Sequence, residues 1–202
     1  MNKFFLTICL TLSVACVSSG QALDRKQSPT DRKEEATRIE FEYKLLATNR
    51  TSTMQKEMNE AAAAGYKFVE VVSGQTAFGG SEALVIMARK RDDDHRARYE
   101  YKLLATTKTG TMQKELQEAG DAGFEHRGQS VFKSEVMVIL ERDKDTKPTL
   151  WDYKLLATNK TSTMQKEVME ATAAGFQFVG FSTGSTFFGG NEVVTIMRRP
   201  RQ

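Results

Sequence analysis

Hydrophobic and polar residues alternate with two different periods along the chain, and the change of period predicts the secondary structure. Over residues 39–47 apolar side chains occupy every second position, which is typical of a strand. Counting from Met54, they recur at i+4, i+7 and i+8, as on one face of a helix. After Gly65 the runs 66–72 and 83–89 are strand-like again. The pattern predicts the order β-α-β-β.

This unit occurs three times. The string YKLLAT begins at Tyr43, Tyr101 and Tyr153, and each copy is followed by a Thr-x-Thr-Met-Gln-Lys-Glu segment and then by a glycine. A repeated supersecondary unit of this kind is the signature of a tandem-repeat architecture. The sequence therefore predicts an α+β protein of three tandem βαββ repeats.

The last strand of each unit is apolar on both faces, which predicts that it lies centrally, giving a three-stranded sheet of order 1-3-2 with one covering helix. In the first strand we expect the face of Tyr43 and Leu45 to be core and the face of Glu42 and Lys44 to be partly exposed. One helix covers only one face of a sheet, and Leu46 then needs cover from elsewhere. We therefore expect the repeats to pack together pseudo-symmetrically, about a threefold axis with the helices outward.

Signals for both ends of the helix are present. Ser52 with Gln55, and Ser162 with Gln165, match a capping box, in which each side chain satisfies a free backbone N–H of the first turn. The glycine that ends each helix is expected to adopt the left-handed conformation, with the following aromatic residue packed on the last turn. These glycines are Gly65, Gly123 and Gly175.

The repeated residues resemble a small bacterial βαββ domain family of unknown function. The resemblance is carried by Tyr43-Lys44-Leu45-Leu46, by the helix that ends at Gly65-Tyr66 and by the strand that ends at Arg89-Lys90, with equivalents in the other copies. It covers most of the chain after residue 38. The family implies a fold and implies no reaction.

The first 22 residues have the pattern of an export signal. Lys3 is their only charge, residues 4–17 form an apolar run, and small residues lead up to Ala22. The run is shorter than the ~20 residues that a membrane-spanning helix needs. We expect an exported protein, periplasmic or secreted, without a membrane span; a lipid anchor at Cys16 is the alternative. Both cysteines lie in this segment, so cleavage after Ala22 would leave a chain without disulfides.

The charge balance and the linker compositions complete the expected organisation. With 29 Lys+Arg against 26 Asp+Glu, the chain lacks the strong positive charge typical of nucleic-acid binding. Polar, mixed-charge stretches predict a tether and two connectors. The expected division is a signal peptide at 1–22, a disordered tether at 23–38, repeat 1 at 39–91, a linker at 92–97, repeat 2 at 98–143 with a shortened hairpin, a linker at 144–149 and repeat 3 at 150–199.

The loop before each helix is the first candidate site. Each loop places one cation and several hydroxyls beside free N–H groups at the positive end of a helix, where a phosphate, sulfate or carboxylate can be held. Threonine-rich helix starts also arise for purely structural reasons. The candidate anion-binding residues are Arg50, Thr51, Thr53, Lys108, Thr109, Thr111, Lys160, Thr161 and Thr163.

The loops at 78–82 and 188–192, each with Phe-Gly-Gly, are the second candidate: either a lip whose phenylalanine enters a partner, or a hairpin turn whose phenylalanine packs on the core. After the leader only His95 and His126 remain as histidines, and no set of zinc ligands or nucleophile–base pair is recognisable, so we expect no catalytic residues, metal or cofactor. The leading hypothesis is a non-enzymatic module that binds a protein or an envelope component. A binder of small anions or anionic glycans is the alternative.

Overall fold

The computed structural model describes residues 41–75, 80–91, 98–185 and 191–201. All of these residues belong to one compact unit. The expected leader and tether, the 92–97 linker with His95, and the phenylalanines of both Phe-Gly-Gly loops, Phe78 and Phe188, lie outside the described residues.

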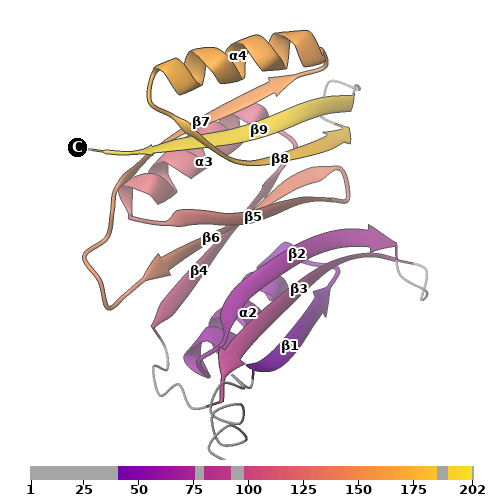
Figure 1. Ribbon diagram of the computed structural model, residues 1–202. Coiled ribbons are helices and arrows are strands. Elements are labelled where there is room, and N and C mark those ends of the chain that lie inside the picture. Colours follow the sequence, from indigo (N-terminus) through magenta and orange to yellow (C-terminus); the bar gives the residue numbers. More distant parts are fainter. Residues whose placement is uncertain (1–40, 76–79, 92–97, 186–190, 202) are drawn as a thin grey trace, which may run out of the picture. The chain divides into compact units, whose positions relative to one another are not determined.

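The described chain contains three copies of the β-α-β-β order, as predicted (Figure 1). In every copy the third strand lies between the other two and pairs antiparallel with both, so the sheets have orders β1-β3-β2, β4-β6-β5 and β7-β9-β8. The predicted order 1-3-2 is therefore confirmed. The elements are β1 (Phe41–Thr48), α2 (Thr51–Ala63), β2 (Lys67–Gln75), β3 (Ser81–Lys90), β4 (Tyr99–Thr106), α3 (Thr109–Asp121), β5 (Glu125–Phe132), β6 (Glu135–Asp143), β7 (Trp151–Thr158), α4 (Thr161–Ala173), β8 (Gln177–Ser185) and β9 (Asn191–Pro200).

The helices end as the sequence predicts. Gly65, Gly123 and Gly175 have φ values of 90°, 78° and 85°, in the left-handed region that glycine adopts without strain. In the first repeat the N–H of Tyr66 donates to the carbonyl of Ala61. The N–H groups of Phe124 and Phe176 make the same bond in the other two copies. Each helix therefore stops in a left-handed glycine cap that turns the chain into the second strand.

An arginine fastens each sheet to the end of its helix. In repeat 3 the guanidinium of Arg199 binds the carboxylate of Asp152 at 3.1 Å and the carbonyl of Ala174 at 2.8 Å, and lies 4.6 Å from the ring of Phe176. Arg89 and Arg142 make the equivalent contacts in repeats 1 and 2. Arg89, which the sequence places beside the first linker, therefore stabilises the fold of its own repeat.

Helices α2 and α3 each contact two sheets, whereas in the described part of the chain α4 contacts only the sheet of its own repeat. Helix α2 packs on β1 of its own repeat and, more extensively, on β4 of the next; α3 likewise packs on β4 and β7 (Figure 1). Strands β2 and β5 are also in contact, as are β5 and β8. Among the described elements, extensive contacts join repeat 1 to repeat 2 and repeat 2 to repeat 3, but not repeat 1 to repeat 3. The repeats are thus stacked in series, and the expected threefold arrangement with outward helices is wrong.

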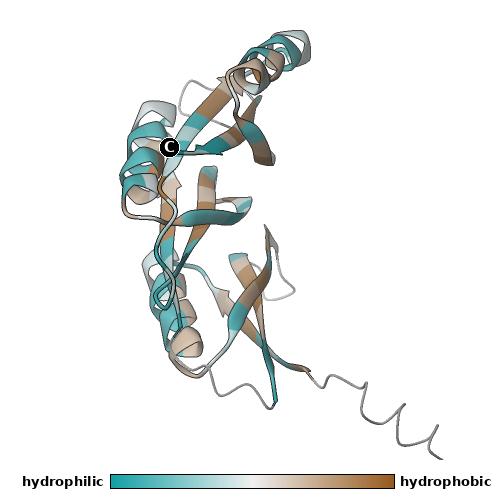
Figure 2. Ribbon diagram, turned by 60° about the vertical axis from the view of Figure 1, so that its left-hand side comes forward, coloured by the Kyte–Doolittle hydropathy of each residue, from teal (hydrophilic) through white to brown (hydrophobic). Residues whose placement is uncertain are grey.

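Serial stacking makes two of the three hydrophobic cores a product of two repeats. The first core combines Met54 and Met58 of α2 with Tyr101 and Ile139 of repeat 2. The second combines α3 with β7 and β9 in the same way. The third contains only buried residues of repeat 3 and is the smallest: Leu156, Met164, Ala171 and Met197. In Figure 2 the hydrophobic colours are concentrated on the strands, while the helices alternate polar and apolar segments.

The expected inward face of the first strand is corrected by this arrangement. The helix of each repeat covers the face of Leu46, which is 5% exposed, and not the face of Tyr43. In repeats 2 and 3 the tyrosine face is covered by the preceding repeat. A single strand cannot show which of its two faces its own helix covers, because both faces here contain apolar residues.

Candidate functional site

The predicted anion-binding loops form the starts of the three helices. Arg50, Lys108 and Lys160 are the residues immediately before α2, α3 and α4, all three are exposed, and no side chain caps these helices. The hydroxyl oxygen of Thr48 instead accepts the N–H of Arg50 at 3.1 Å, and Thr106 and Thr158 do the same in their repeats. The predicted capping boxes are therefore absent, because Ser52 and Ser162 lie inside the first turn.

The structure does not gather these loops into one site. The repeat 1 loop contacts the β5–β6 turn, where Lys133 donates to the carbonyl of Asn49 at 2.7 Å. The repeat 2 loop borders a hollow of about 10 Å³, shared with Leu155 and Val194. A space of this volume holds no more than one water molecule. A wider hollow beside Thr109 also includes Glu167, whose charge repels an anion.

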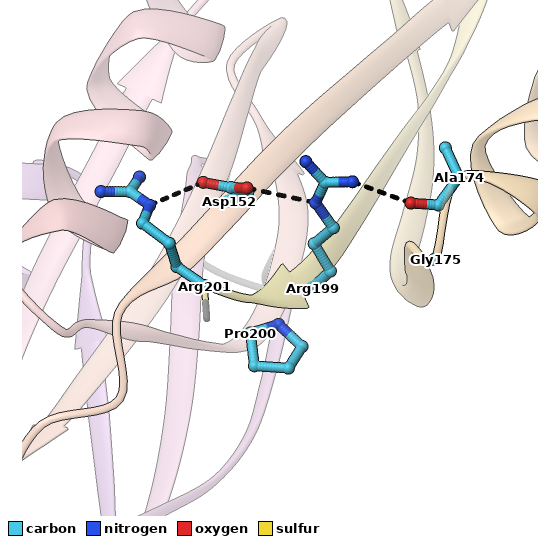
Figure 3. Close-up of a pocket in the computed structure, with 6 residues that line it drawn as sticks. All are labelled: Asp152, Ala174, Gly175, Arg199, Pro200 and Arg201. Atoms are coloured by element: carbon cyan, nitrogen blue, oxygen red, sulfur yellow. Dashed lines mark hydrogen bonds and ion pairs between the residues drawn. The ribbon is translucent and has the colours of Figure 1, made fainter.

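A larger hollow of about 500 Å³ lies at the end of repeat 3 (Figure 3). Both of its arginines already have partners: Arg199 binds Asp152 and Ala174, and Arg201 binds Asp152 at 2.8 Å and Asp121 at 2.6 Å. Carboxylates neutralise the positive charge of both arginines. The hollow therefore lies beside the contacts of Arg199 described above and offers no unpaired cation to a ligand.

The most specific polar contacts of the molecule lie between repeats, at a socket that receives a tyrosine. Between repeats 1 and 2 the amide of Asn59 accepts the N–H of Tyr101 at 2.9 Å and donates to its carbonyl at 2.9 Å. Gln55 accepts the N–H of Leu103 at 2.8 Å. The phenolic oxygen of Tyr101 accepts the N–H of Phe68 at 2.8 Å, at a bulge in β2. Helix α2 and strand β2 thus bind the outer edge of β4.

The same socket is built again between repeats 2 and 3. Gln117 and Gln113 accept the N–H groups of Tyr153 and Leu155 at 3.1 Å and 2.7 Å. The hydroxyl of Tyr153 accepts the N–H of His126, at the equivalent bulge in β5, at 2.7 Å. Burial raises the pKa of Tyr153 to about 12, so its hydroxyl remains protonated. Helix amides therefore satisfy several outer backbone groups of edge strands β4 and β7, which hinders unwanted pairing of these edges.

A charge pair distinguishes the two interfaces. Buried Glu141 accepts a hydrogen bond from the hydroxyl of Tyr101 at 2.7 Å and pairs with Arg127 at 2.9 Å, and it lies 3.8 Å from Lys67 of repeat 1. The equivalent position in repeat 3 is Arg198, which pairs with Glu125 of repeat 2 at 2.7 Å. The two interfaces thus carry opposite charges at one position. Each repeat therefore matches the charge of its own neighbour, which favours the observed order of the repeats.

His126 is a buried titratable residue of the second interface. Burial lowers its pKa to about 4, aided by Arg198 and Arg127 and opposed by Gln129 and Glu125. Its imidazole lies 3.2 Å from the amide oxygen of Gln129 and next to Gly180 of repeat 3.

We expect acid to destabilise the protein through this histidine. The unfolded chain binds a proton below about pH 6.5 and the folded protein only below about pH 4, so the free energy of unfolding falls by about 3 kcal/mol across that window. His126→Phe installs the residue found at this position in repeats 1 and 3 and removes the effect. Urea unfolding of both proteins from pH 7.5 to 4 tests this. The prediction fails if the difference between their stabilities does not change with pH.

The socket positions of the two terminal repeats are open. Tyr43 is 67% exposed, whereas Tyr101 and Tyr153 are 2% and 4% exposed; Ile86 is 40% exposed, whereas Ile139 and Ile196 are fully buried. We call the residues Phe41, Tyr43, Leu45, Val72 and Ile86 the open sheet face.

At the other end Gln165, Met169, Phe178 and Phe181 are exposed at the positions that form sockets in repeats 1 and 2. We call these four residues the open socket.

Sequence reasoning did not identify the socket residues. The spacing of Gln55 predicts a capping box, and the sequence predicts no role for Asn59, Gln113 or Gln117. The repeated tyrosine of YKLLAT was a usable signal, as were the amides one position after each core methionine or leucine of the helix. Neither signal says that the partner of the amide is another repeat.

Comparison with known proteins identifies no relative: no family model, no curated protein and no solved structure matches the chain. In the part of the chain that the structure describes, no cluster of three or more His, Cys, Asp or Glu side chains is arranged to hold a metal ion. No helix among the described residues is long and apolar enough to cross a membrane.

Proposed function

We propose that this chain is a non-catalytic protein-binding module, and that the open sheet face is its binding surface. The observation that supports the proposal is the contrast between equivalent residues. The same tyrosine and isoleucine positions are buried between repeats, the same leucine position is partly buried there, and all three are exposed in repeat 1. A face that is covered twice within one molecule has the composition of an interface and not of a solvated surface. Contiguous exposed apolar patches of this kind mark interaction sites.

The residues of this face are neighbours. The rings of Phe41 and Tyr43 lie 6.2 Å apart, and Leu45 is paired with Ile86 across β1 and β3. Val72 pairs with Leu84, two residues before Ile86 on β3. Strand β1 is also an edge strand, so its outer backbone groups are available to a partner in the way that those of β4 are available to Asn59. In the proposed setting the protein acts outside the cytoplasm, as its leader-like segment predicts.

Site-specific photo-crosslinking in the producing cells tests the proposal. A benzoylphenylalanine placed at Tyr43 is expected to give a defined covalent adduct with a protein. The matched control places the same residue at Lys56, whose side chain is 78% exposed on the outer side of α2. If both positions give the same adducts, or if neither gives any, the open sheet face is not a binding surface.

A further inference from the structure

We infer that the partner of the open sheet face is the open socket of a second copy of this chain, so that copies associate head to tail. This inference rests on the proposed function and names its partner. Its basis is that the protein already forms this interface twice within one chain, between repeats 1 and 2 and between repeats 2 and 3. Repeat 3 presents the socket side of that interface, and repeat 1 presents the sheet face that enters the socket.

The hydrogen-bonding groups of the two open ends correspond. Gln165 of α4 occupies the position of Gln55 and Gln113, which accept the N–H of a leucine in the next repeat; in a second copy that leucine is Leu45. The bulge of β8 at Phe178 repeats the bulges at Phe68 and His126. The N–H of Phe178 is therefore placed to donate to the hydroxyl oxygen of Tyr43. The N–H groups at the two earlier bulges donate to Tyr101 and Tyr153 in the same way.

The charge pattern of the ends is compatible as well. The first interface pairs Lys67 with Glu141 and the second pairs Glu125 with Arg198. At the two open ends the equivalent residues are Gln177 and Ala88, which are neutral. At this pair of positions no like charges meet. Phe178 and Phe181, whose rings are 6.2 Å apart, add exposed apolar area that the open sheet face can cover.

Two positions differ from the internal interfaces and make the contact between copies weaker than the internal one. Met169 stands where Asn59 and Gln117 bind the backbone of the tyrosine, so one set of hydrogen bonds is lost. Glu70 stands where Gly128 and Gly180 allow the close approach of Phe68 and His126. The association is therefore reversible, and restoring the internal residues should strengthen it.

The interface joins two different surfaces, so it is heterologous and propagates into chains or closes into a ring. This property gives a sharp test by mixing. Leu45→Arg blocks the open sheet face and Phe181→Glu blocks the open socket, and both residues are more than 60% exposed, so the folded protein tolerates them. Leu150→Arg changes another exposed leucine outside both surfaces and is the matched control.

The chain is expressed from its full sequence, purified in its processed form and followed by sedimentation velocity over a range of concentrations. Wild type and Leu150→Arg should form oligomers that grow with concentration, and each blocked variant alone should be monomeric. Their equimolar mixture should give dimers and nothing larger, because only one pair of intact surfaces remains. Met169→Gln with Glu70→Gly should lower the dissociation constant by about tenfold.

Other results overturn the inference. A wild type that stays monomeric at millimolar concentration contradicts it, and so does a blocked variant that still oligomerises. Adducts at position 43 distinguish the two proposals. An adduct with a different protein refutes the second copy as partner but leaves the proposed function standing. An adduct with the chain's own residues 1–40 refutes both proposals. An adduct between two copies that maps to α4 or β8 supports both.

Discussion

Replacing Gly120 by alanine is expected to lower the free energy of unfolding by about 1–3 kcal/mol, the usual cost of overpacking. A Cβ atom at this position would lie 2.3 Å from the backbone oxygen of Trp151 and 2.9 Å from the ring of Tyr153. A backbone oxygen cannot move aside as a flexible side chain can. Helix α3 would have to withdraw from β7, which opens the interface between repeats 2 and 3.

Gly110→Ala in the same helix is the matched control. No atom lies within 4 Å of a Cβ added there, so the substitution should stabilise the protein by up to about 0.5–1 kcal/mol through the helix preference of alanine. Urea denaturation of both variants measures the two changes. Equal effects in the same direction would show that the close approach of α3 and β7 does not contribute to stability.

Arg127→Met is expected to destabilise the protein by about 3 kcal/mol, because it leaves the carboxylate of Glu141 buried without its closest cation. Glu141 is 2% exposed, and Lys67 is 3.8 Å away and half exposed. The methionine keeps the packing of the arginine stem. The loss therefore reports on the unpaired charge.

The double variant Arg127→Met/Glu141→Ala completes the test. Alanine stands at the position of Glu141 in repeat 1, at Ala88, and removing the carboxylate removes the unpaired charge. We expect the double variant to be more stable than Arg127→Met alone, as measured in a double-mutant cycle by chemical denaturation. Additive losses in the cycle would mean that the pair does not interact, and the interpretation of the interface charges would be wrong.

The elements of this protein could be predicted from local sequence because their causes are local. The period of apolar residues gave every strand and helix, and the apolar character of strand 83–89 on both faces gave its central place in the sheet. Gly65 and Tyr66 gave the end of the helix, because the left-handed cap depends on the residues next to it. Repetition gave the number of units.

The candidate site could not be predicted in the same way. Gln55 fits the spacing of a capping box, yet its amide binds Leu103 of the next repeat. Sequence spacing describes what a side chain can reach within its own helix. It does not describe the strand, far along the chain, that stacking brings to the same side chain. The same limit explains why Tyr43 looked like core.

What the sequence by itself determined is therefore the repeating unit: its strands, its helix, its sheet order and its number of copies. Only the tertiary structure decided which face of each sheet is covered by its own helix and which by the preceding repeat. The physical reason is that a sheet has two apolar faces and a helix covers one, so the second face is stabilised only by another repeat. The same condition leaves Tyr43 and Phe181 exposed at the two ends of the stack.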